Sequence, residues 1–336
     1  MPPTRPSIAD VAQKAGVSIA TVSRVLNGKP PVNEETARRV REAVAELNYV
    51  PHAAARTLAS RRTYTLGLLL PEIGGVFFQP LLRGVEAGVR EAGFDLLIHT
   101  TQTHSKDTPR RTLAEHNTDG LLVFTGSLDV KELTRLNGIG FPVVLLHQAP
   151  PQNLAIPYIT IENQAGARKI VEHLIIVHHC HRIVFLRGPQ EEEDSAWREK
   201  GYRSALKAHK IPFDPALIQQ GDFNREIAKN SVQKLLSEGV QFDSIFTGDD
   251  ESAIGVLQAL RQSARKVPEE IAVIGFDDSL FANTLLPPLT TVIAPTEQVG
   301  HQAVRQLVRI IQGEEVEPCL VLPTEIVIRQ SCGCHG

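Results

Sequence analysis

The chain has 336 residues, of which 42% are hydrophobic and 22% are charged. This length exceeds one ordinary domain and the composition excludes a disordered or fibrous protein, so we expect two or three compact units. The net charge of −3 excludes a uniformly basic protein, but residues 1–62 hold ten Lys and Arg against five Asp and Glu. A basic first segment joined to an acidic remainder suits a polyanionic partner that binds at one end of the chain. The alternative is that the uneven charges are only solvated and bind no partner.

Residues 7–29 predict two short helices joined by a glycine turn. Ser7 and Asp10 have the spacing of a capping box, and apolar residues recur at helical intervals from position 8 to position 15. Gly16 ends this helix and Ser18 caps the next one. Two short helices joined by such a turn are the arrangement by which a helix-turn-helix reaches the major groove of DNA. An ordinary amphipathic helical hairpin has the same sequence pattern.

The second helix has a short polar outer face. Its apolar residues at positions 22, 25 and 26 turn inward, and Asn27 with the following glycine ends the helix. The outer face carries a methyl group at Ala20, a hydroxyl at Thr21 and a guanidinium at Arg24. These groups fit base edges and thymine methyls in the major groove.

A third helix is predicted from its cap at Asn33 to Leu47, which completes a three-helix head. Residues 52–60 have high helix propensity but are too few to form a stable helix alone in water. They are therefore predicted to be a conditional helix.

From Thr65 onward, short apolar runs alternate with helical stretches, which is typical of βα units and parallel strands. The predicted strands are Leu66–Leu70, Phe94–Ile98, Leu121–Phe124, Val143–Leu146, Ile183–Leu186, Ser244–Phe246, Ile271–Phe276 and Ile326–Ile328. Two sheets are needed for them, and the break is expected near residues 158–164.

The sequence predicts a cytoplasmic protein with no metal site and no cofactor. No apolar run approaches the roughly 18–20 residues of a membrane span, and the first residues lack the apolar centre of a signal peptide. Cys332-Gly-Cys334-His335 and His178-His-Cys-His181 contain metal donors. The cluster at 332–335 lacks zinc-ribbon spacing and lies in a segment that is expected to fray. The cluster at 178–181 lies at a helix-to-strand turn. Neither cluster therefore predicts a four-ligand metal site.

Several motifs resemble those of the lactose-repressor (LacI/GalR) family. They are Ile8-Ala-Asp-Val-Ala, Ala15-Gly-Val-Ser, Thr21-Val-Ser-Arg-Val-Leu-Asn-Gly, Leu47-Asn-Tyr-Val-Pro, Val273-Ile-Gly-Phe-Asp-Asp and Pro287-Pro-Leu-Thr-Thr-Val. The resemblance extends from about residue 7 to about residue 330. It implies a transcription regulator with an all-α helix-turn-helix head and an α/β, periplasmic-binding-protein-like core of two parallel-sheet subdomains.

The resemblance also implies the domain boundaries. The head is expected at residues 1–62, with a hinge helix at 52–60, and the effector-binding and dimerisation core at 63–336. The first subdomain would comprise about 63–162 and 293–320, and the second about 163–290 and 323–336. The chain would cross between them near 161–165, 289–294 and 316–323. A homodimer on a near-palindromic operator is implied, and without a heptad repeat after Ile328 a tetramerising coiled coil is not expected.

In this family the hinge helix forms on the operator and wedges a leucine into the minor groove, and by position that leucine is Leu58. His52 stands where the family often has asparagine, which puts a backbone contact or cap there in doubt. The residues expected to contact DNA are Ser7, Ser18, Ile19, Ala20, Thr21, Ser23, Arg24, Asn27, His52, Ala54, Ala55 and Leu58.

The effector is expected in the cleft between the subdomains, because open parallel sheets bind ligands beyond the carboxyl ends of their strands. The residues expected to contact it are Phe77, Phe78, His147, Arg198, Asp249 and Asp277. Arg198 has the position of the family's effector-binding arginine, and Trp197 adds a possible stacking surface. Asp250 and Asp278 are expected to be helix N-caps.

The class of effector is predicted from an acidic loop. Four carboxylates, Glu191–Asp194, stand in a row that is usually a solvated loop. If Glu193 or Asp194 turns inward, the cleft gains hydrogen-bond acceptors and repels anions. A neutral sugar or polyol is then favoured over a phosphorylated sugar, a nucleotide or a nucleobase.

Three classes of function compete. An exported sugar receptor is disfavoured, because we find a DNA-binding pattern and no signal segment. An enzyme is disfavoured, because no phosphate-binding loop, nucleophile elbow or zinc-protease motif is found, although Asp249 and Asp277 could act as acid and base on a sugar. A repressor is the prediction, with a nucleobase-responsive, co-repressed regulator as the alternative. The operator and the direction of the response are left open.

Overall fold

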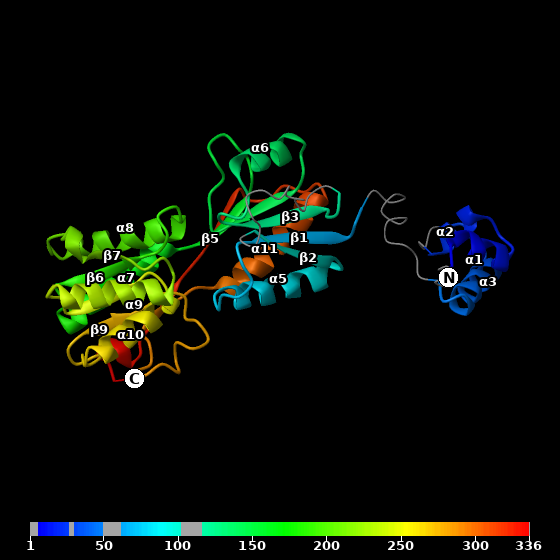
Figure 1. Ribbon diagram of the computed structural model, residues 1–336. Helices are drawn as coiled ribbons and strands as arrows, with labels where there is room; N and C mark the ends of the chain where they lie inside the picture. Colours follow the sequence, from blue (N-terminus) through cyan, green and yellow to red (C-terminus); the bar gives the residue numbers. More distant parts are fainter. Residues whose placement is uncertain (1–5, 27–29, 50–61, 102–115, 336) are drawn as a thin grey trace, which may run out of the picture. The chain divides into compact units, whose positions relative to one another are not determined.

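The computed structural model describes residues 6–26, 30–49, 62–101 and 116–335. Its contacts divide the chain into two compact units, Met1–Thr63 and Tyr64–Gly336. The described part of the first unit is helical, and the second contains the parallel sheets (Figure 1). Among these residues, no helix combines the length and the apolarity that crossing a membrane requires.

The described residues of the first unit form three helices, α1 (Ile8–Ala15), α2 (Ile19–Leu26) and α3 (Glu34–Glu46). The predicted caps are confirmed. The N–H of Asp10 donates to Ser7 Oγ (3.3 Å) and the N–H of Ser7 donates to Asp10 Oδ2 (2.8 Å), which is a capping box. Asn33 Oδ1 accepts the N–H of Thr36 at the start of α3.

A small apolar core joins these helices. Its buried members are Val11, Ala12, Ala15, Val22, Val40, Ala43 and Tyr49. Gly16 ends α1 at φ +64°, a left-handed conformation that glycine adopts without a steric penalty. The guanidinium of Arg39 donates to the carbonyls of Ala15 and Gly16. The turn between α1 and α2 is therefore fastened to α3.

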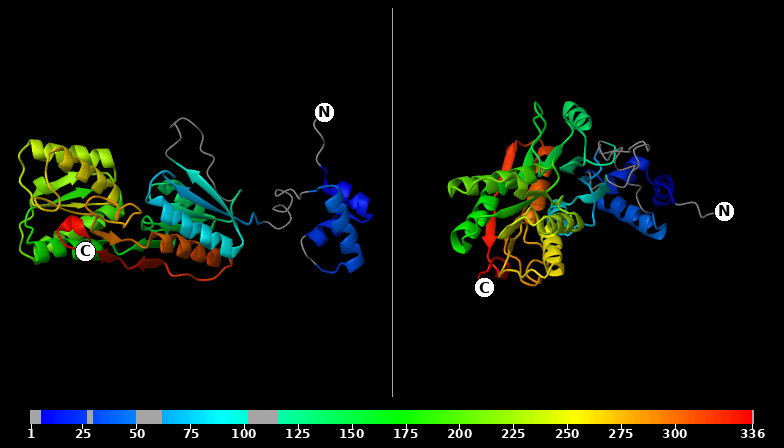
Figure 2. Two further views of the ribbon diagram at one scale, coloured as in Figure 1. Left: turned by 90° about the horizontal axis from the view of Figure 1, so that it is seen from below. Right: turned by 60° about the vertical axis from the view of Figure 1, so that its left-hand side comes forward.

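The first sheet of the second unit has six parallel strands in the order β11-β5-β4-β3-β1-β2. They are β1 (Thr65–Leu70), β2 (Asp95–Thr100), β3 (Gly120–Phe124), β4 (Val143–Leu146), β5 (Tyr158–Ile161) and β11 (Cys319–Leu322). Helices α5 (Phe78–Ala92) and α11 (Thr296–Ile311) lie side by side on one face, and α6 (Val130–Gly138) covers the other (Figure 2). Gly84 permits this approach, because an added Cβ would lie 1.9 Å from the carbonyl oxygen of Glu297.

The second sheet has four parallel strands in the order β7-β6-β8-β9. They are β6 (Ile183–Arg187), β7 (Ile218–Gln220), which follows the short 3-10 helix η1 (Pro215–Leu217), β8 (Ser244–Thr247) and β9 (Ala272–Ile274). Helices α7 (Asn163–His178) and α8 (Glu193–Ala208) cover one face, and α9 (Arg225–Ser237) and α10 (Asp250–Gln262) cover the other. Both sheets are thus covered on both faces, as apolar parallel strands require.

Three connections join the sheets within the described residues. Strand β5 is followed directly by α7, which takes the chain from the first sheet to the second. Strand β10 (Thr291–Ile293) leads back to α11, and β12 (Glu325–Val327) leads from β11 to the 3-10 helix η2 (Gln330–Cys332). β10 and β12 pair antiparallel, so the second and third connections run side by side.

The predicted two-sheet α/β fold is confirmed, and all eight predicted strands are present with ends within two residues of the prediction. Seven of them lie in the two parallel sheets, and the eighth, β12, lies in the antiparallel pair with β10. Strand β7 was not predicted, because its sequence Ile-Gln-Gln has one apolar residue and lies at a sheet edge. The sequence also did not predict β5, β10 and β11 as strands. It marked the segment of β5 only as the break between the two sheets, and those of β10 and β11 only as crossings between the subdomains.

The expectation that the segment around Cys332 frays is wrong. Cys332 is 2% exposed and its neighbour Ser331 is fully buried. Ser331 Oγ donates to the carbonyl of Val273 (2.6 Å) and accepts the N–H of Thr290 (2.8 Å). These bonds hold η2 against β9, a contact between distant segments that local composition does not indicate.

Candidate functional site

The outer face of α2 is the surface predicted to contact DNA. Its members Ser18, Ile19, Ala20 and Arg24 are exposed, and Thr21 and Ser23 are half-buried. Ser18 also caps the helix, because its Oγ accepts the N–H of Thr21 (3.2 Å). Ile19 is 51% exposed. The face therefore presents apolar groups beside hydroxyl and guanidinium groups, the mixture that base edges and thymine methyls accept.

The other predicted DNA contacts are described only in part. Asn27, His52, Ala54, Ala55 and Leu58 lie outside the described residues, and so does the hinge segment 52–60. Ser7 is exposed, but its hydroxyl donates to Asp10 Oδ2 (2.8 Å) and accepts the N–H of the same residue. Its visible role is to cap α1.

A cleft of about 1370 Å³ lies where the strands of the two sheets end. Phe77 and Phe78 line it beside the first sheet, and Arg198, Asp249 and Asp277 line it beside the second. The cleft thus brings together five of the six residues predicted to contact an effector. His147, the sixth, is 1% exposed and is not part of the lining.

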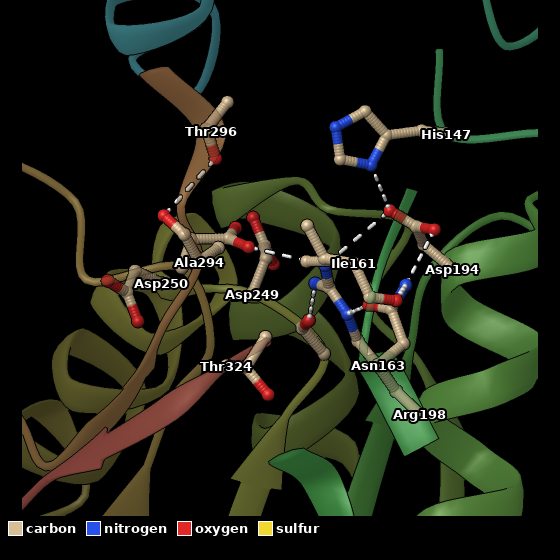
Figure 3. A network of polar contacts seen from close by, with 12 residues as sticks. His147, Ile161, Asn163, Asp194, Arg198, Asp249, Asp250, Ala294, Thr296 and Thr324 are labelled. Atoms are coloured by element: carbon tan, nitrogen blue, oxygen red, sulfur yellow. Dashed lines mark hydrogen bonds and ion pairs between the residues drawn. The ribbon is translucent and has the colours of Figure 1, made fainter. Parts of the chain in front are cut away.

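Arg198 of α8 is the centre of a buried polar network (Figure 3). Its Nε donates to Asn163 Oδ1 (2.8 Å), its Nη1 donates to the carbonyl of Gly248 (2.5 Å), and its Nη2 lies 3.2 Å from Asp277 Oδ1. The guanidinium also lies over the ring of Phe276, 3.8 Å from its centroid. A buried cation is tolerated when it is paired and hydrogen-bonded in this way. Arg198 therefore joins α7, β8 and the loop after β9.

Asp194 continues this network toward the first sheet. Its Oδ2 lies 2.8 Å from His147 Nδ1, and its Oδ1 accepts the amide of Asn163 (2.7 Å). Burial opposes ionisation of this carboxyl, but the charge and hydrogen bond of His147, together with Arg198 and Asn163, outweigh it and lower its pKa. His147 follows β4 and Asp194 lies on α8, so this pair connects the two sides of the cleft.

The prediction that Asp250 caps α10 is wrong by one residue. The N-cap is Asp249, which accepts the N–H groups of Glu251 (3.2 Å) and Ser252 (3.1 Å), and burial raises its pKa. Asp250 accepts the hydroxyls of Thr291 (2.7 Å) and Ser279 (2.9 Å), and burial raises its pKa to about 7. Two adjacent aspartates cannot be assigned to cap or cleft from sequence alone, because either can accept the amide hydrogens of the first turn.

Asp277 has an unusual backbone and an incompletely bonded carboxylate. Its φ of +108° is outside the range that non-glycine residues prefer. Burial and the nearby carboxylates of Asp250 and Asp249 raise its pKa well above the usual value, against the pull of Arg198. Its Oδ1 lies 3.2 Å from Arg198 Nη2 but accepts no hydrogen bond from the described residues. A ligand hydroxyl can therefore still donate to it.

Asp278 is not a helix cap, contrary to prediction. No helix follows it, and its Oδ1 lies 2.7 Å from Nη2 of Arg329, which joins the loop after β9 to the segment after β12. The sequence pattern Gly-Phe-Asp-Asp marks the strand end correctly, but the role of its second aspartate depends on a residue 51 positions away.

An aromatic cluster forms the opposite side of the cleft. The Phe77 ring lies 5.5 Å from that of Phe78 and 5.9 Å from that of Phe124, and both pairs are edge-to-face. His147 lies 5.7 Å from Phe77 and 5.4 Å from Phe124, measured between ring centroids. The first-sheet side is therefore mostly apolar, whereas the second-sheet side is charged.

The sequence missed the loop after β7 and offered Trp197 as a stacking surface. Phe223 of that loop lines the cleft and lies 5.6 Å from the Arg198 guanidinium. Recognition of β7 would have indicated it as a strand-end residue. Trp197, in contrast, is 43% exposed beneath Lys200 and does not line the cleft. The acidic run is only partly a solvated loop, because Asp194 turns inward in the first turn of α8.

Two family models match separate parts of the chain. The model of bacterial regulatory proteins of the lacI family matches residues 7–52, and that of a periplasmic binding protein-like domain matches residues 171–332. The HTH-type transcriptional regulator CelR of Thermobifida fusca is 36% identical over 97% of this chain and 98% of its own length. The chain belongs to the lacI family of bacterial regulatory proteins.

Other comparisons agree with membership of the lacI family. The catabolite control protein A of Priestia megaterium is 34% identical over 97% of this chain and 98% of its own length. A structure of a CelR–cellobiose complex, 33% identical, superposes with a TM-score of 0.72 and covers 97% of this chain and all of its own. The lac repressor dimer bound to operator and the anti-inducer ONPF, 25% identical, gives 0.85 with 98% and 99% coverage. This lacI-family chain is a DNA-binding transcription regulator.

Proposed function

We propose that this regulator is a repressor whose operator affinity is controlled by a neutral sugar bound in the cleft between the two sheets. The observation that carries the proposal is the lining of the cleft, with aromatic rings on one side and the Arg198–carboxylate network on the other. Aromatic rings stack on the apolar faces of sugar rings, and carboxylates accept hydrogen bonds from sugar hydroxyls.

The charges of the cleft favour a neutral ligand over an anion. Among the described residues, eleven carboxylate side chains and three arginines line it. Each arginine is already paired with a carboxylate: Arg83 with Glu297 (3.3 Å), Arg225 with Glu251 (2.9 Å), and Arg198 with Asp277. A phosphate would meet net repulsion here, because the cations that could bind it are engaged.

The relatives narrow the ligand to a mono- or disaccharide, for which the cleft has room. Binding pockets commonly measure roughly 300–1,000 Å³, and this cleft is larger than that range. The relative of known structure that is 33% identical was solved with cellobiose. Other curated relatives are named ribose operon repressors and are 31–34% identical. We therefore infer a neutral saccharide, with a β-linked disaccharide as the first candidate.

In this proposal the protein binds its ligand without catalysing a reaction on it. Of the two aspartates considered as acid and base, Asp249 caps α10 and Asp277 lies 3.2 Å from the Arg198 guanidinium. Operator recognition by α2 further implies a homodimer on two half-sites, acting in the cytoplasm where the DNA is. The domain boundaries inferred from the family resemblance belong to the same proposal.

The test is calorimetric titration of the full chain with cellobiose, glucose, ribose, glucose 6-phosphate and adenine, with and without operator DNA selected from a random library. We expect a neutral saccharide to bind, to be recovered unchanged, and to alter operator affinity by the same factor as operator alters its own affinity. Binding of only the phosphorylated sugar or adenine would refute the neutral effector. Failure to select any DNA would refute the repressor, and turnover of a sugar would indicate an enzyme.

A further inference from the structure

Two histidines of α7 and two cysteines near the C-terminus converge at one point of the second sheet's unit. One donor atom from each of His173, His178, Cys332 and Cys334 lies within 4.8 Å of all the others. Cys332 is buried and the other three are half-buried. The four residues belong to segments about 150 positions apart in the sequence, the last turns of α7 and the region of η2, which lies beside β9 (Figure 1).

Four of the six distances between these atoms match the edges of a metal-centred tetrahedron, and the other two are within 4.8 Å. The two Nε2 atoms of His173 and His178 lie 3.3 Å apart. His173 Nε2 lies 3.5 Å from Cys332 Sγ and 3.6 Å from Cys334 Sγ, and His178 Nε2 lies 3.4 Å from Cys334 Sγ. Around a tetrahedral zinc with Zn–N of about 2.1 Å and Zn–S of about 2.3 Å, the N–N edge is about 3.4 Å and the N–S edge about 3.6 Å.

The surroundings preserve this arrangement. Gly333, between the two cysteines, has φ +107°, and an added Cβ would lie 3.1 Å from His178 Nδ1, so the cysteine turn passes close to the imidazole. The hydroxyl of Thr290 donates to Cys332 Sγ (3.1 Å). Such outer hydrogen bonds to a ligating sulfur orient it and stabilise its thiolate. Both cysteines are free thiols, so no disulfide competes for them.

We propose that His173, His178, Cys332 and Cys334 bind one zinc ion as a structural Cys₂His₂ site. Zinc binding forms two Zn–N and two Zn–S bonds and releases the two thiol protons to water. Four protein ligands leave no open coordination position, which distinguishes a structural site from a catalytic one. The ion fastens the segment after β12 to the end of α7, whose first residue, Asn163, holds Arg198 in the cleft.

The sequence argument against a metal considered the two donor clusters separately. It tested each donor cluster by its own spacing, whereas each segment supplies only half of the ligands. His179 and His181, which made the first cluster look dense, are not members of the site. The expected fraying of the cysteine segment is removed by the bonds of Ser331 to β9.

The first test is the metal content of untagged, full-length protein after dialysis against metal-free buffer, measured by mass spectrometry of the elements. We expect about one zinc per chain in the wild type. Cys334→Ser and His178→Gln should each lose most of it. Cys319→Ser and His181→Gln, which change the same residue types outside the site, should retain it. Equal zinc in all five proteins, or none in the wild type, would overturn the proposal.

A second measurement needs no variant and so does not depend on a variant's folding. The zinc X-ray absorption spectrum of the wild type should fit two sulfurs at about 2.3 Å and two nitrogens at about 2.0–2.1 Å. Replacement by Co²⁺ should give the intense visible bands of a tetrahedral thiolate complex, and Cys319→Ser should give the same bands. A shell of oxygens and nitrogens alone would mean that the metal is bound elsewhere, and the proposal would be wrong.

Discussion

The outer face of α2 and the wall of the cleft use polar side chains in opposite ways. On α2, Ser18 and Arg24 are exposed, and the contacts that hold the helix come from its own cap and its inner face. In the cleft, Arg198 and Asp194 are almost fully buried and bond to residues from other elements. Substitutions on the first surface are therefore expected to leave the fold intact, whereas substitutions in the second are expected to destabilise it. If α2 reads DNA and the cleft binds the saccharide, as proposed above, DNA recognition is separable from stability in this chain and ligand recognition is not.

The largest expected effect is that of Arg198→Ala. It leaves the carboxylates of Asp277 and Asp194 without their buried cation, which typically destabilises a protein by about 3–5 kcal/mol. We expect a matching loss in the unfolding free energy of the second unit, measured by urea denaturation followed by circular dichroism, together with loss of saccharide binding. Operator binding without saccharide should persist at temperatures where the variant stays folded.

Arg203→Ala is the matched control for this comparison. Arg203 lies on the same helix, but it is exposed; it pairs with the half-buried Glu199 (2.7 Å) and lies over the Phe213 ring (3.7 Å to its centroid). An exposed ion pair contributes about 0–1 kcal/mol and an exposed cation–π contact about 0.5–1 kcal/mol, so the control should lose much less stability than Arg198→Ala. Similar losses in both variants would show that the Arg198 network is no more important than a surface pair.

Arg24→Ala should have the next largest effect, and on DNA binding alone. Loss of a guanidinium that reads base edges weakens specific binding by about 1–3 kcal/mol. Since Arg24 is exposed, the unfolding free energy should change by less than about 0.5 kcal/mol. Fluorescence anisotropy with operator and with random DNA measures the difference. An equal loss on both DNAs would mean that Arg24 contacts only phosphate.

The same contrast explains how much the sequence could predict. The caps at Ser7 and Asn33 were predicted because both partners of each bond lie within three residues. The strands were predicted from apolar runs, except β7, which has too few apolar residues. In the cleft, sequence indicated which strand ends matter. It could not assign Asp249 and Asp250 or place His147 behind Asp194, because those roles depend on residues 29 to 47 positions away.

Asp250 gives the cleft a dependence on pH that α2 lacks. An aspartate in the unfolded chain loses its proton near pH 3.9, whereas burial raises the pKa of Asp250 in the folded state to about 7. Between these values the folded state binds more protons, so this group's contribution to stability is greatest near pH 4 and declines as the pH rises to 7. Asp250→Asn should remove that decline, which is about 2–3 kcal/mol between pH 5 and pH 8, as measured by urea titrations at the two pH values. Parallel pH profiles would contradict the assignment.

The smallest effect, about 1 kcal/mol, is expected from Ser7→Ala, which removes the capping box of α1. Ser7 was also predicted to contact DNA, and a second substitution separates the two roles. Ser7→Gly removes the hydroxyl but costs only a few tenths of a kcal/mol at an N-cap, and it does not place a second carboxylate beside Asp10. If Ser7 only caps the helix, Ser7→Gly should nearly preserve both the melting temperature of the first unit and its affinity for operator. If the Ser7 hydroxyl also contacts the DNA backbone, Ser7→Gly should nearly preserve the melting temperature and still weaken binding on every DNA. A melting temperature of Ser7→Ala equal to that of the wild type would show that the capping box does not stabilise α1 as its geometry indicates.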